Sequence, residues 1–480
     1  MKNNRPNIIL IMTDQMRGDC LSGLGHPDVK TPNLDTLMAN GLCFKNAYSA
    51  CPSCIPARAG LFTGLSPKHH KRVGYQDRVR FEYQNTLASE LNRAGYYTQA
   101  VGKMHVHPQR NNMGFQNVIL HDGYLAANRN VHLPFYEMQD ECDDYFHFLK
   151  CELGADADLA DLGIESNSWT QRPFMYEEKY HPTNWVTHEA IDFLRRRDTD
   201  LPFFLFLSYV RPHPPFDAPR SFFDMYDEDA LRKPYIGSWE TRGDLLEKGK
   251  IMNSDTGPID ETMLRKARKG YYACISHLDN QIGRFLMALH RYQLESNTLM
   301  LFTSDHGELL GDHYMYRKIR PYQGSVHIPL FLSGPDHLIE RKGCCDDLAE
   351  LSDIMPTILS KAGVKDFDVM DGENLLHTER VKRTYIHGEH SAVGFGSQLG
   401  NQYIVTKEDK FIWFMESGKE QYFCLDRDPN ELENRICDPA CEARINELRQ
   451  LLILELMDRE EGYVSSSQLI AGQRQRSILS

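Results

Sequence analysis

The chain has 480 residues, with 54 Lys and Arg against 67 Asp and Glu, so its formal net charge at pH 7 is −13. This acidic balance, without any Lys- and Arg-rich run, disfavours nucleic acid and anionic membranes as main partners. No run approaches the roughly 18 apolar residues of a membrane span. The five apolar residues at 8–12 lead into Thr13-Asp14-Gln15 rather than a cleavage site, so we expect no signal peptide.

Cysteine usage adds an expectation about location. Twelve cysteines occur without the repeated CxxC spacing of a structural zinc site, and they are too sparse for a disulfide scaffold. We therefore expect reduced thiols and a cytoplasmic protein, or a periplasmic one if the chain is a truncated precursor.

Short apolar runs at residues 7–13, 202–210, 298–303 and 328–333 predict buried parallel strands, because they are too continuous for half-exposed ones. Helical patterns lie between them, most clearly at 263–290, where apolar residues recur at spacings of three and four. This alternation predicts an α/β sheet flanked by helices. The irregular segments 140–183 and 235–258 are interpreted as insertions over one rim of the sheet.

The pattern of apolar and polar residues changes after about residue 370. Strand-like runs at 384–387, 402–406, 410–415 and 421–425 precede a helical pattern at 442–459. They predict a small antiparallel sheet with a terminal helix. We expect a catalytic α/β domain over residues 1–370 and a small α+β domain over residues 371–480.

Acidic side chains follow two of the predicted strands. Asp14 ends the first strand, and Asp305 follows the third within Ser-Asp-His-Gly-Glu. Ligands of open α/β sheets bind at the carboxyl ends of the strands, so the two carboxylates form a plausible metal pair. Helix capping explains either one alone about equally well. The nearby Gly-Asp-His at residues 311–313 favours a site.

Basic side chains follow two further strands. His213 lies in Arg-Pro-His-Pro-Pro after residues 202–210, and Lys103 and His105 follow a strand pattern at 95–101. His213 is a candidate for acid–base chemistry, although a lone histidine is more often structural. Lys103 and His105 could neutralise a tetrahedral anion, and a solvated loop end is their alternative.

The segment 51–64 contains the pattern Cys-x-Pro-x-Arg. Pro56 favours a helix start, which places Cys54 beside free backbone N–H groups and Arg58 one turn further on. The residues alone allow a thiolate nucleophile, a redox pair with Cys51 or a buried cysteine. The redox interpretation is disfavoured, because Pro52 and the surrounding pattern do not fit a thioredoxin-like unit.

Taken together, these motifs resemble those of the type I sulfatases of the alkaline-phosphatase superfamily, over nearly the whole chain. The resemblance implies a large mixed, mostly parallel sheet flanked by helices and a small C-terminal antiparallel sheet. Ala57 replaces the commoner serine of the cysteine motif, and Gln15 and His306 replace an Asp and an Asn. With Gln15 and His306 at these positions, the sequence resembles the branch of the family that contains choline sulfatase and the phosphonate and phosphate-ester hydrolases. The matching segments are Cys54-Ile55-Pro56-Ala57-Arg58, Gly102-Lys103-Met104-His105, Ser304-Asp305-His306-Gly307-Glu308 and Lys318.

The resemblance implies a sulfuric-ester hydrolase acting on a sulfated sugar or an aryl sulfate. Cys54 would be oxidised to formylglycine by a formylglycine-generating enzyme, and the metal would be Ca²⁺ or else Mn²⁺. A phosphonate or phosphate mono/diester hydrolase is the first alternative, followed by a thiol enzyme and a non-catalytic binding protein. The implied metal ligands are Asp14, Gln15, Cys54, Asp305 and His306. The implied catalytic residues are Cys54, Lys103, Lys318 and Arg58 on the sulfate, His213 as general acid and His105 as base.

Overall fold

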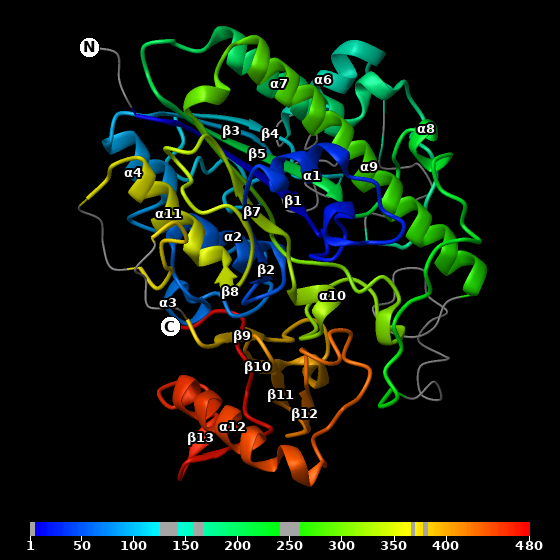
Figure 1. The fold of residues 1–480 in the computed structure, drawn as a ribbon, viewed down its shortest axis with the longest axis vertical. Helices are drawn as coiled ribbons and strands as arrows, with labels where there is room; N and C mark the ends of the chain where they lie inside the picture. Colours follow the sequence, from blue (N-terminus) through cyan, green and yellow to red (C-terminus); the bar gives the residue numbers. More distant parts are fainter. Residues whose placement is uncertain are drawn as a thin grey trace.

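The computed structural model describes residues 5–124, 143–157, 159, 167–240, 260–365, 370–377 and 383–480 (Figure 1). Its centre is an eight-stranded sheet of order β4-β3-β5-β1-β6-β7-β2-β8. The strands are β1 (Asn7–Asp14), β2 (Gly41–Tyr48), β3 (Tyr97–Gly102), β4 (Asn117–Leu120), β5 (Phe203–Pro212), β6 (Thr298–Ser304), β7 (Leu330–Ser333) and β8 (Gly343–Glu350).

The sheet is mixed and mostly parallel, as predicted. β1 is parallel to β5 and β6, and β3 is parallel to β4 and β5. The expectation that residues 328–333 form a parallel strand is wrong, because β7 is antiparallel to both β6 and β2. A strand buried on both faces is apolar in either direction, so its composition carries no information about direction.

Helices cover both faces of the large sheet (Figure 1). Ile9 and Ile11 of β1 pack in the core with α1 (Pro32–Ala39), α7 (Pro182–Arg196) and α9 (Glu261–Arg291). Ile8 and Leu10 point to the opposite face, as alternation along a strand requires, and pack with α2 (Cys54–Thr63), α4 (Leu87–Arg93) and α11 (Ile354–Lys361). The remaining helices near this sheet are α3 (Pro67–His70), α6 (Asp144–Leu153), α8 (Arg220–Phe223) and α10 (Gln323–Val326).

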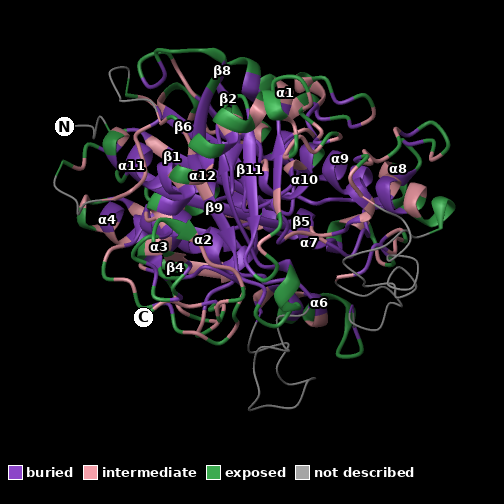
Figure 2. Ribbon diagram, turned by 90° about the horizontal axis from the view of Figure 1, so that it is seen from below, coloured by how far each residue is buried: buried purple, intermediate pink, exposed green. Residues whose placement is uncertain are grey.

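The helix predicted at residues 263–290 is α9, which begins two residues earlier and ends one later. The side chain of Asp260 accepts hydrogen bonds from the backbone N–H groups of Thr262 and Met263, which satisfies donors at the helix start. Figure 2 shows buried strands at the centre and exposed residues around them. No helix of the described residues is both long and apolar enough to cross a membrane.

A second sheet lies near the C-terminus, as predicted. It is antiparallel, of order β12-β11-β10-β9, and formed by β9 (Ile386–His390), β10 (Asn401–Val405), β11 (Lys410–Phe414) and β12 (Glu420–Phe423). Helix α12 (Glu442–Leu456) packs Leu448 and Leu452 against Phe411 and Trp413. The hairpin β13 (Val464–Ser465) and β14 (Gln468–Leu469) follows. The domain boundary at residue 370 stays a prediction, and most of the segment predicted as an insertion at 235–258 lies outside the described residues.

The opposite face of this small sheet joins the rest of the molecule. Tyr403 and Ile412 pack in one buried cluster with Tyr48, Leu309 and Tyr322 from around the large sheet. The loop after β9 therefore lies close to the carboxyl edge of β1 and β6, where the candidate site is found.

Candidate active site

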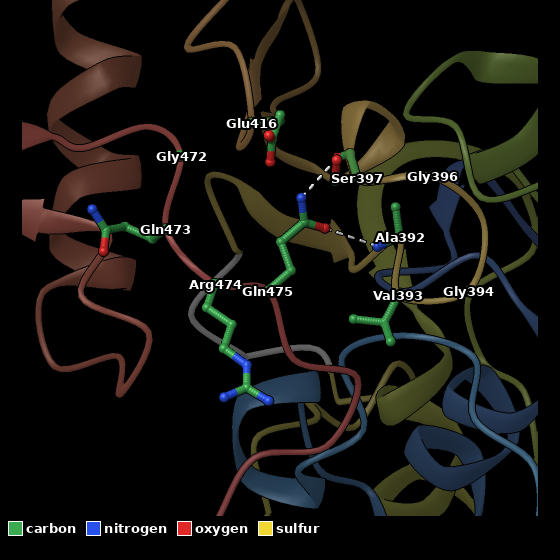
Figure 3. A pocket seen from close by; sticks show the side chains of 10 residues that line it. All are labelled: Ala392, Val393, Gly394, Gly396, Ser397, Glu416, Gly472, Gln473, Arg474 and Gln475. Atoms are coloured by element: carbon green, nitrogen blue, oxygen red, sulfur yellow. Dashed lines mark hydrogen bonds between the residues drawn. The ribbon is translucent and has the colours of Figure 1, made fainter.

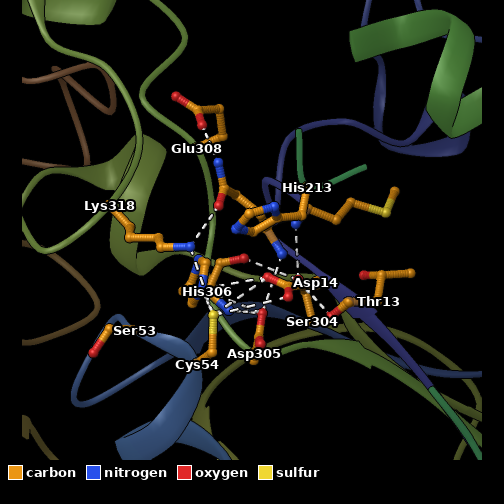
Figure 4. Close-up of polar contacts among 12 residues, drawn as sticks. Thr13, Asp14, Ser53, Cys54, His213, Ser304, Asp305, His306, Glu308 and Lys318 are labelled. Carbon is orange, nitrogen blue, oxygen red and sulfur yellow. Dashed lines mark hydrogen bonds and ion pairs between the residues drawn. The ribbon is translucent and has the colours of Figure 1, made fainter. Parts of the chain in front are cut away.

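The site forms where strands β1 and β6 of the large sheet end and helix α2 begins. Thr13 of β1 pairs with Ser304 of β6, so Asp14 and Asp305, which follow them, lie side by side. Helix α2 begins at Cys54, as its proline pattern predicted, and its first residue points to the same edge. Figure 4 shows the resulting cluster. Ligand atoms from Asp14, Cys54, Asp305 and His306 all lie within 4.8 Å of one another.

The cluster is closely packed and buried. Sγ of Cys54 lies 3.3 Å from Nε2 of His306 and 3.7 Å from Oδ1 of Asp14. Nε2 of His306 lies 3.5 Å from a carboxylate oxygen of both Asp14 and Asp305. The three charged or polar side chains are fully buried, and Cys54 is nearly so. The sequence prediction that these four residues converge is consistent with this geometry.

Two lysines face the cluster. Lys103, which follows β3, forms an ion pair with Asp14, and its Nζ lies 3.8 Å from Sγ of Cys54. Nζ of Lys318 lies 3.6 Å from the same sulfur. Any anion formed at residue 54 therefore lies between two ammonium groups and at a helix N-terminus, all of which favour negative charge.

These charges shift the pKa values in the site. Burial and the charge of Asp14 act to raise the pKa of Cys54, but Lys103 and Lys318 outweigh them and hold it below its usual value. Burial also acts to raise the pKa of Asp14, yet the adjacent Lys103 keeps it well below the usual range. The site therefore favours the ionised forms of both the Asp14 carboxyl and the Cys54 thiol.

The donor set fits a divalent cation. Two buried carboxylates this close repel each other unless positive charge compensates them. No hydrogen bond from the described residues reaches Oδ2 of Asp305, although Nη2 of Arg58 lies 3.3 Å away. Nδ1–H of His306 donates to the carbonyl of Gly307 at 3.0 Å, which directs Nε2 toward the carboxylates. A carbonyl partner of this kind is what orients a metal-binding imidazole.

Gln15 lies beside this donor set but is otherwise engaged. Nζ of Lys318 donates to its Oε1 at 2.7 Å, and its Nε2 donates to Glu308. Glu308, which we did not predict as a site residue, also accepts a hydrogen bond from the backbone N–H of Leu310 at 2.8 Å. Glu308 ends the Ser-Asp-His-Gly-Glu run, and this position is the sequence feature from which its place in the site could have been predicted. The role of Gln15 as a metal ligand stays a prediction.

Arg58 has different contacts from those expected of a sulfate-binding residue. Its Nη1 donates to the carbonyl of Lys103 at 2.7 Å and to Oγ of Ser208 at 2.9 Å, while Nη2 faces Asp305. The guanidinium is fully buried. It therefore ties together the segments that carry Lys103 and Asp305.

The two candidate histidines have different surroundings. Nδ1–H of His213 donates to the carbonyl of Pro214 at 2.8 Å, which directs Nε2 away from that carbonyl. Figure 4 places His213 beside Asp14, and Asp14 and His213 each affect the other's pKa. His105 has a left-handed backbone with φ of 53°. Oδ1 of Asp122 accepts hydrogen bonds from the backbone N–H groups of Met104 and His105, both at 2.9 Å.

Two supporting residues were not predicted. Asp122 comes two residues after β4, so its position at a strand end was a usable signal. His390 of β9 lies with its Nε2 2.9 Å from Oγ of Ser53, next to Cys54. Nothing in the sequence links residues 53 and 390, because more than 300 residues separate them. The small sheet thus contacts the loop that carries the cysteine.

This arrangement defines an anion-binding hydrolytic site at the carboxyl edge of an α/β sheet. Comparison with known proteins agrees with that class. Residues 6–364 match the sulfatase family, and residues 311–458 match the family described as N-sulphoglucosamine sulphohydrolase, C-terminal. The chain is 49% identical over 474 residues to an arylsulfatase of Clostridium perfringens, covering 98% of both chains. It is 30% identical to a choline-sulfatase of Rhizobium meliloti, covering 92% of this chain and 84% of that one.

Solved structures share the fold. A phosphonate monoester hydrolase of Agrobacterium radiobacter superimposes with a TM-score of 0.76 at 25% identity, covering 98% of this chain and 100% of that one. The chain belongs to the sulfatase family of the alkaline-phosphatase superfamily. It is a sulfuric-ester hydrolase, and the family implies a divalent metal and formylglycine.

Proposed function

We propose that this sulfatase removes sulfate from a sulfated sugar or an aryl sulfate, using formylglycine at residue 54 and Ca²⁺. The observation that carries the proposal is the position of Cys54, whose sulfur lies within 4 Å of His306, Asp14, Lys103 and Lys318. A nucleophile at that atom lies between the metal-compatible donors and the two cations. The arylsulfatase and choline-sulfatase relatives support sulfate esters as the substrate class.

Formylglycine and a divalent ion would add chemistry that the side chains of this site do not have by themselves. Formylglycine at residue 54 would supply a hydroxyl nucleophile in place of the thiol and would allow the sulfate to be released afterwards. A divalent ion at this site would supply Lewis-acid chemistry, which polarises a bound oxygen and favours the ionised form of a hydroxyl. Asp14, Asp305 and His306 would hold the ion, and Gln15 could join them. Carboxylate and amide oxygens favour Ca²⁺, whereas the imidazole is the ligand that Mn²⁺ accepts better.

The lysines bind the sulfate group. Lys103 and Lys318 donate to sulfate oxygens, and they stabilise the negative charge that gathers there in the transition state. Arg58 acts as a positioning residue. It holds Lys103 by donating a hydrogen bond to the Lys103 carbonyl, and it holds Asp305 through an ion pair. Removing Arg58 would therefore disturb both the cation and the carboxylate.

His213 is the proposed general acid. Its Nδ1 is held by the Pro214 carbonyl, so Nε2 is the atom free to carry the transferred proton. Burial, Lys318 and Lys103 lower the pKa of His213, while Asp14 opposes them. The negative charge of a bound sulfate ester offsets the lysines, so it raises the pKa of His213 at the moment when a proton is needed. His105 is the proposed base and would accept a proton at residue 54.

The test of this chemistry is a peptide mass measurement. Protein produced together with a formylglycine-generating enzyme should show the aldehyde at residue 54 and an unmodified Cys51 in the same peptide. Activity should rise in proportion to the aldehyde fraction, and added Ca²⁺ should restore activity after chelation. A fully active preparation that contains only unmodified Cys54 would refute the formylglycine proposal.

A phosphonate or phosphate-ester hydrolase is the second candidate, and the superposition on the Agrobacterium enzyme favours it. The same cations would bind a phosphoryl group. Side-by-side kcat/KM values for nitrophenyl sulfate and phenyl phosphonate esters decide between them. The proposal requires the sulfate ester to be the better substrate.

A further inference from the structure

A hollow of about 520 Å³ opens between the loop after β9 and the C-terminal tail (Figure 3). Its volume falls within the roughly 300–1,000 Å³ of small-molecule sites. Val393 and Ser397 line it from the loop, Glu416 comes two residues after β11, and Gln473 and Arg474 belong to the tail. No residue of the catalytic cluster lines it, so it is separate from the sulfate-binding atoms.

The two walls of the hollow are held together by hydrogen bonds. Oε1 of Gln475 accepts from the backbone N–H of Ala392 at 3.0 Å, and Nε2 of Gln475 donates to the carbonyl of Ser397 at 2.7 Å. Both walls also bind residue 73, because Ser391 donates to the carbonyl of Val73 and Val73 donates to the carbonyl of Ser477. The hollow is therefore a feature of the fold rather than a gap between independent segments.

The same loop reaches the catalytic site on two sides. Phe395 packs its ring 6.0 Å from that of Tyr75, and Tyr75 packs 6.0 Å from the ring of His105. Ala392 shares a small apolar cluster with Ile319, the residue after Lys318. A chain of ring contacts therefore connects the loop that lines the hollow with His105 in the candidate site.

The chemistry of the hollow suits a carbohydrate. Val393 lines the hollow and is 47% exposed, so the apolar face of a sugar ring could pack against it, and Phe395, 40% exposed, lies beside the hollow on the same loop. Gln473 and Glu416 offer hydrogen-bonding groups for hydroxyls. Arg474 is exposed, and no ion pair joins it to another residue in the described parts of the chain. A guanidinium is well matched to the paired oxygens of an anionic group.

We propose that this hollow is a subsite for the sugar chain of a sulfated oligosaccharide, in which Arg474 binds a sulfate on a unit beyond the one that is cleaved. This inference rests on the proposed function, because it assumes that the sulfate ester at residue 54 is carried by a sugar. The subsite predicts that a sulfated sugar, and not a simple aryl sulfate, is the substrate that this protein binds best.

The test measures inhibition of nitrophenyl sulfate hydrolysis by heparin-derived and chondroitin-sulfate-derived oligosaccharides of two, four and six units. For the unaltered enzyme, the inhibition constant should fall by about tenfold from the disaccharide to the longer members of at least one series. Arg474→Ala should remove most of that gain, and Arg474→Lys should restore part of it. Because inhibition constants are compared within each variant, differences in basal activity do not affect the result.

Arg476→Ala is the matched control. Arg476 lies on the same exposed tail but pairs with Glu460 at 3.9 Å and does not line the hollow. It should keep the full dependence on chain length. Inhibition that is independent of length in both series, or an equal dependence in Arg474→Ala and the unaltered enzyme, overturns the subsite. Failure to hydrolyse nitrophenyl sulfate would instead count against the proposed function.

Discussion

The role of His213 can be tested by the leaving group of the substrate. General acid catalysis accelerates a reaction by about 10²–10⁴-fold where it is fully needed, which is about 2.7–5.4 kcal/mol of barrier. A sugar alkoxide is strongly basic and needs that proton, whereas nitrophenoxide leaves readily without it. His213→Ala should therefore lose about 10²–10⁴-fold in kcat on a sugar or alkyl sulfate and less than about tenfold on nitrophenyl sulfate.

The structure explains why the loss should be selective. The ring of His213 is held by the Pro214 carbonyl and makes no hydrogen bond to the cluster among the described residues, so its removal leaves the metal-compatible donors in place. Steady-state kinetics on both substrates measure the effect, with Lys103→Ala as the comparison. Lys103 is assigned to oxygens that both substrates share, so its loss should slow them to a similar extent. Equal losses for His213→Ala on the two substrates would refute its role as proton donor, and a selective loss for His105→Ala would mean that the two histidines are reversed.

Two further predictions concern the metal and the stability of the fold. Asp305→Asn should lose bound metal and most activity while remaining folded. Asp312→Asn should instead lower the free energy of unfolding by about 1–3 kcal/mol, because it removes the carboxylate that contacts Nη1 of the buried Arg17 at 2.8 Å, while Asp19 still pairs with the same guanidinium. Metal analysis and urea unfolding separate the two outcomes, and metal retained by Asp305→Asn would contradict the site. Burial lowers the pKa of His70 to about 3, against roughly 6.5 when unfolded. The unfolded chain therefore gains a proton as the pH falls below about 6.5, and folded-state stability is lost. Between pH 7.5 and 5.5, His70→Asn should lose about 1.4 kcal/mol less than the unaltered protein, and an equal loss in both would contradict it.

The chemistry-bearing segments could be located from the sequence with little ambiguity. The run that ends in Asp14 and the run that precedes Asp305 are strands, because continuous apolar residues followed by polar ones mark buried strands and their ends. Helix α2 begins at Cys54, because proline favours the first turn of a helix. Local composition and local backbone preference were sufficient for these elements.

The direction of a strand and the contacts between residues far apart in the sequence could not be predicted from such local patterns. The apolar run at residues 328–333 forms a strand, but its antiparallel direction depends on the path of the chain between β6 and β7. Arg58 was expected to bind sulfate, and its contacts with Ser208 and Asp305 exist only because α2 packs beneath the ends of β5 and β6. The contact of His390 with Ser53 likewise depends on where the small sheet docks.

The sequence by itself thus determined the class of fold, the family and the segments that carry the candidate site residues. These properties are encoded in short patterns whose physical basis is local. Only the tertiary structure decided which polar groups meet. The ion pair of Lys103 with Asp14, the hydrogen bond of Lys318 to Gln15 and the loop that carries Phe395 beside Tyr75 all join distant segments. Their geometry follows from strand order and from the packing of the two sheets, which are properties of the whole folded chain.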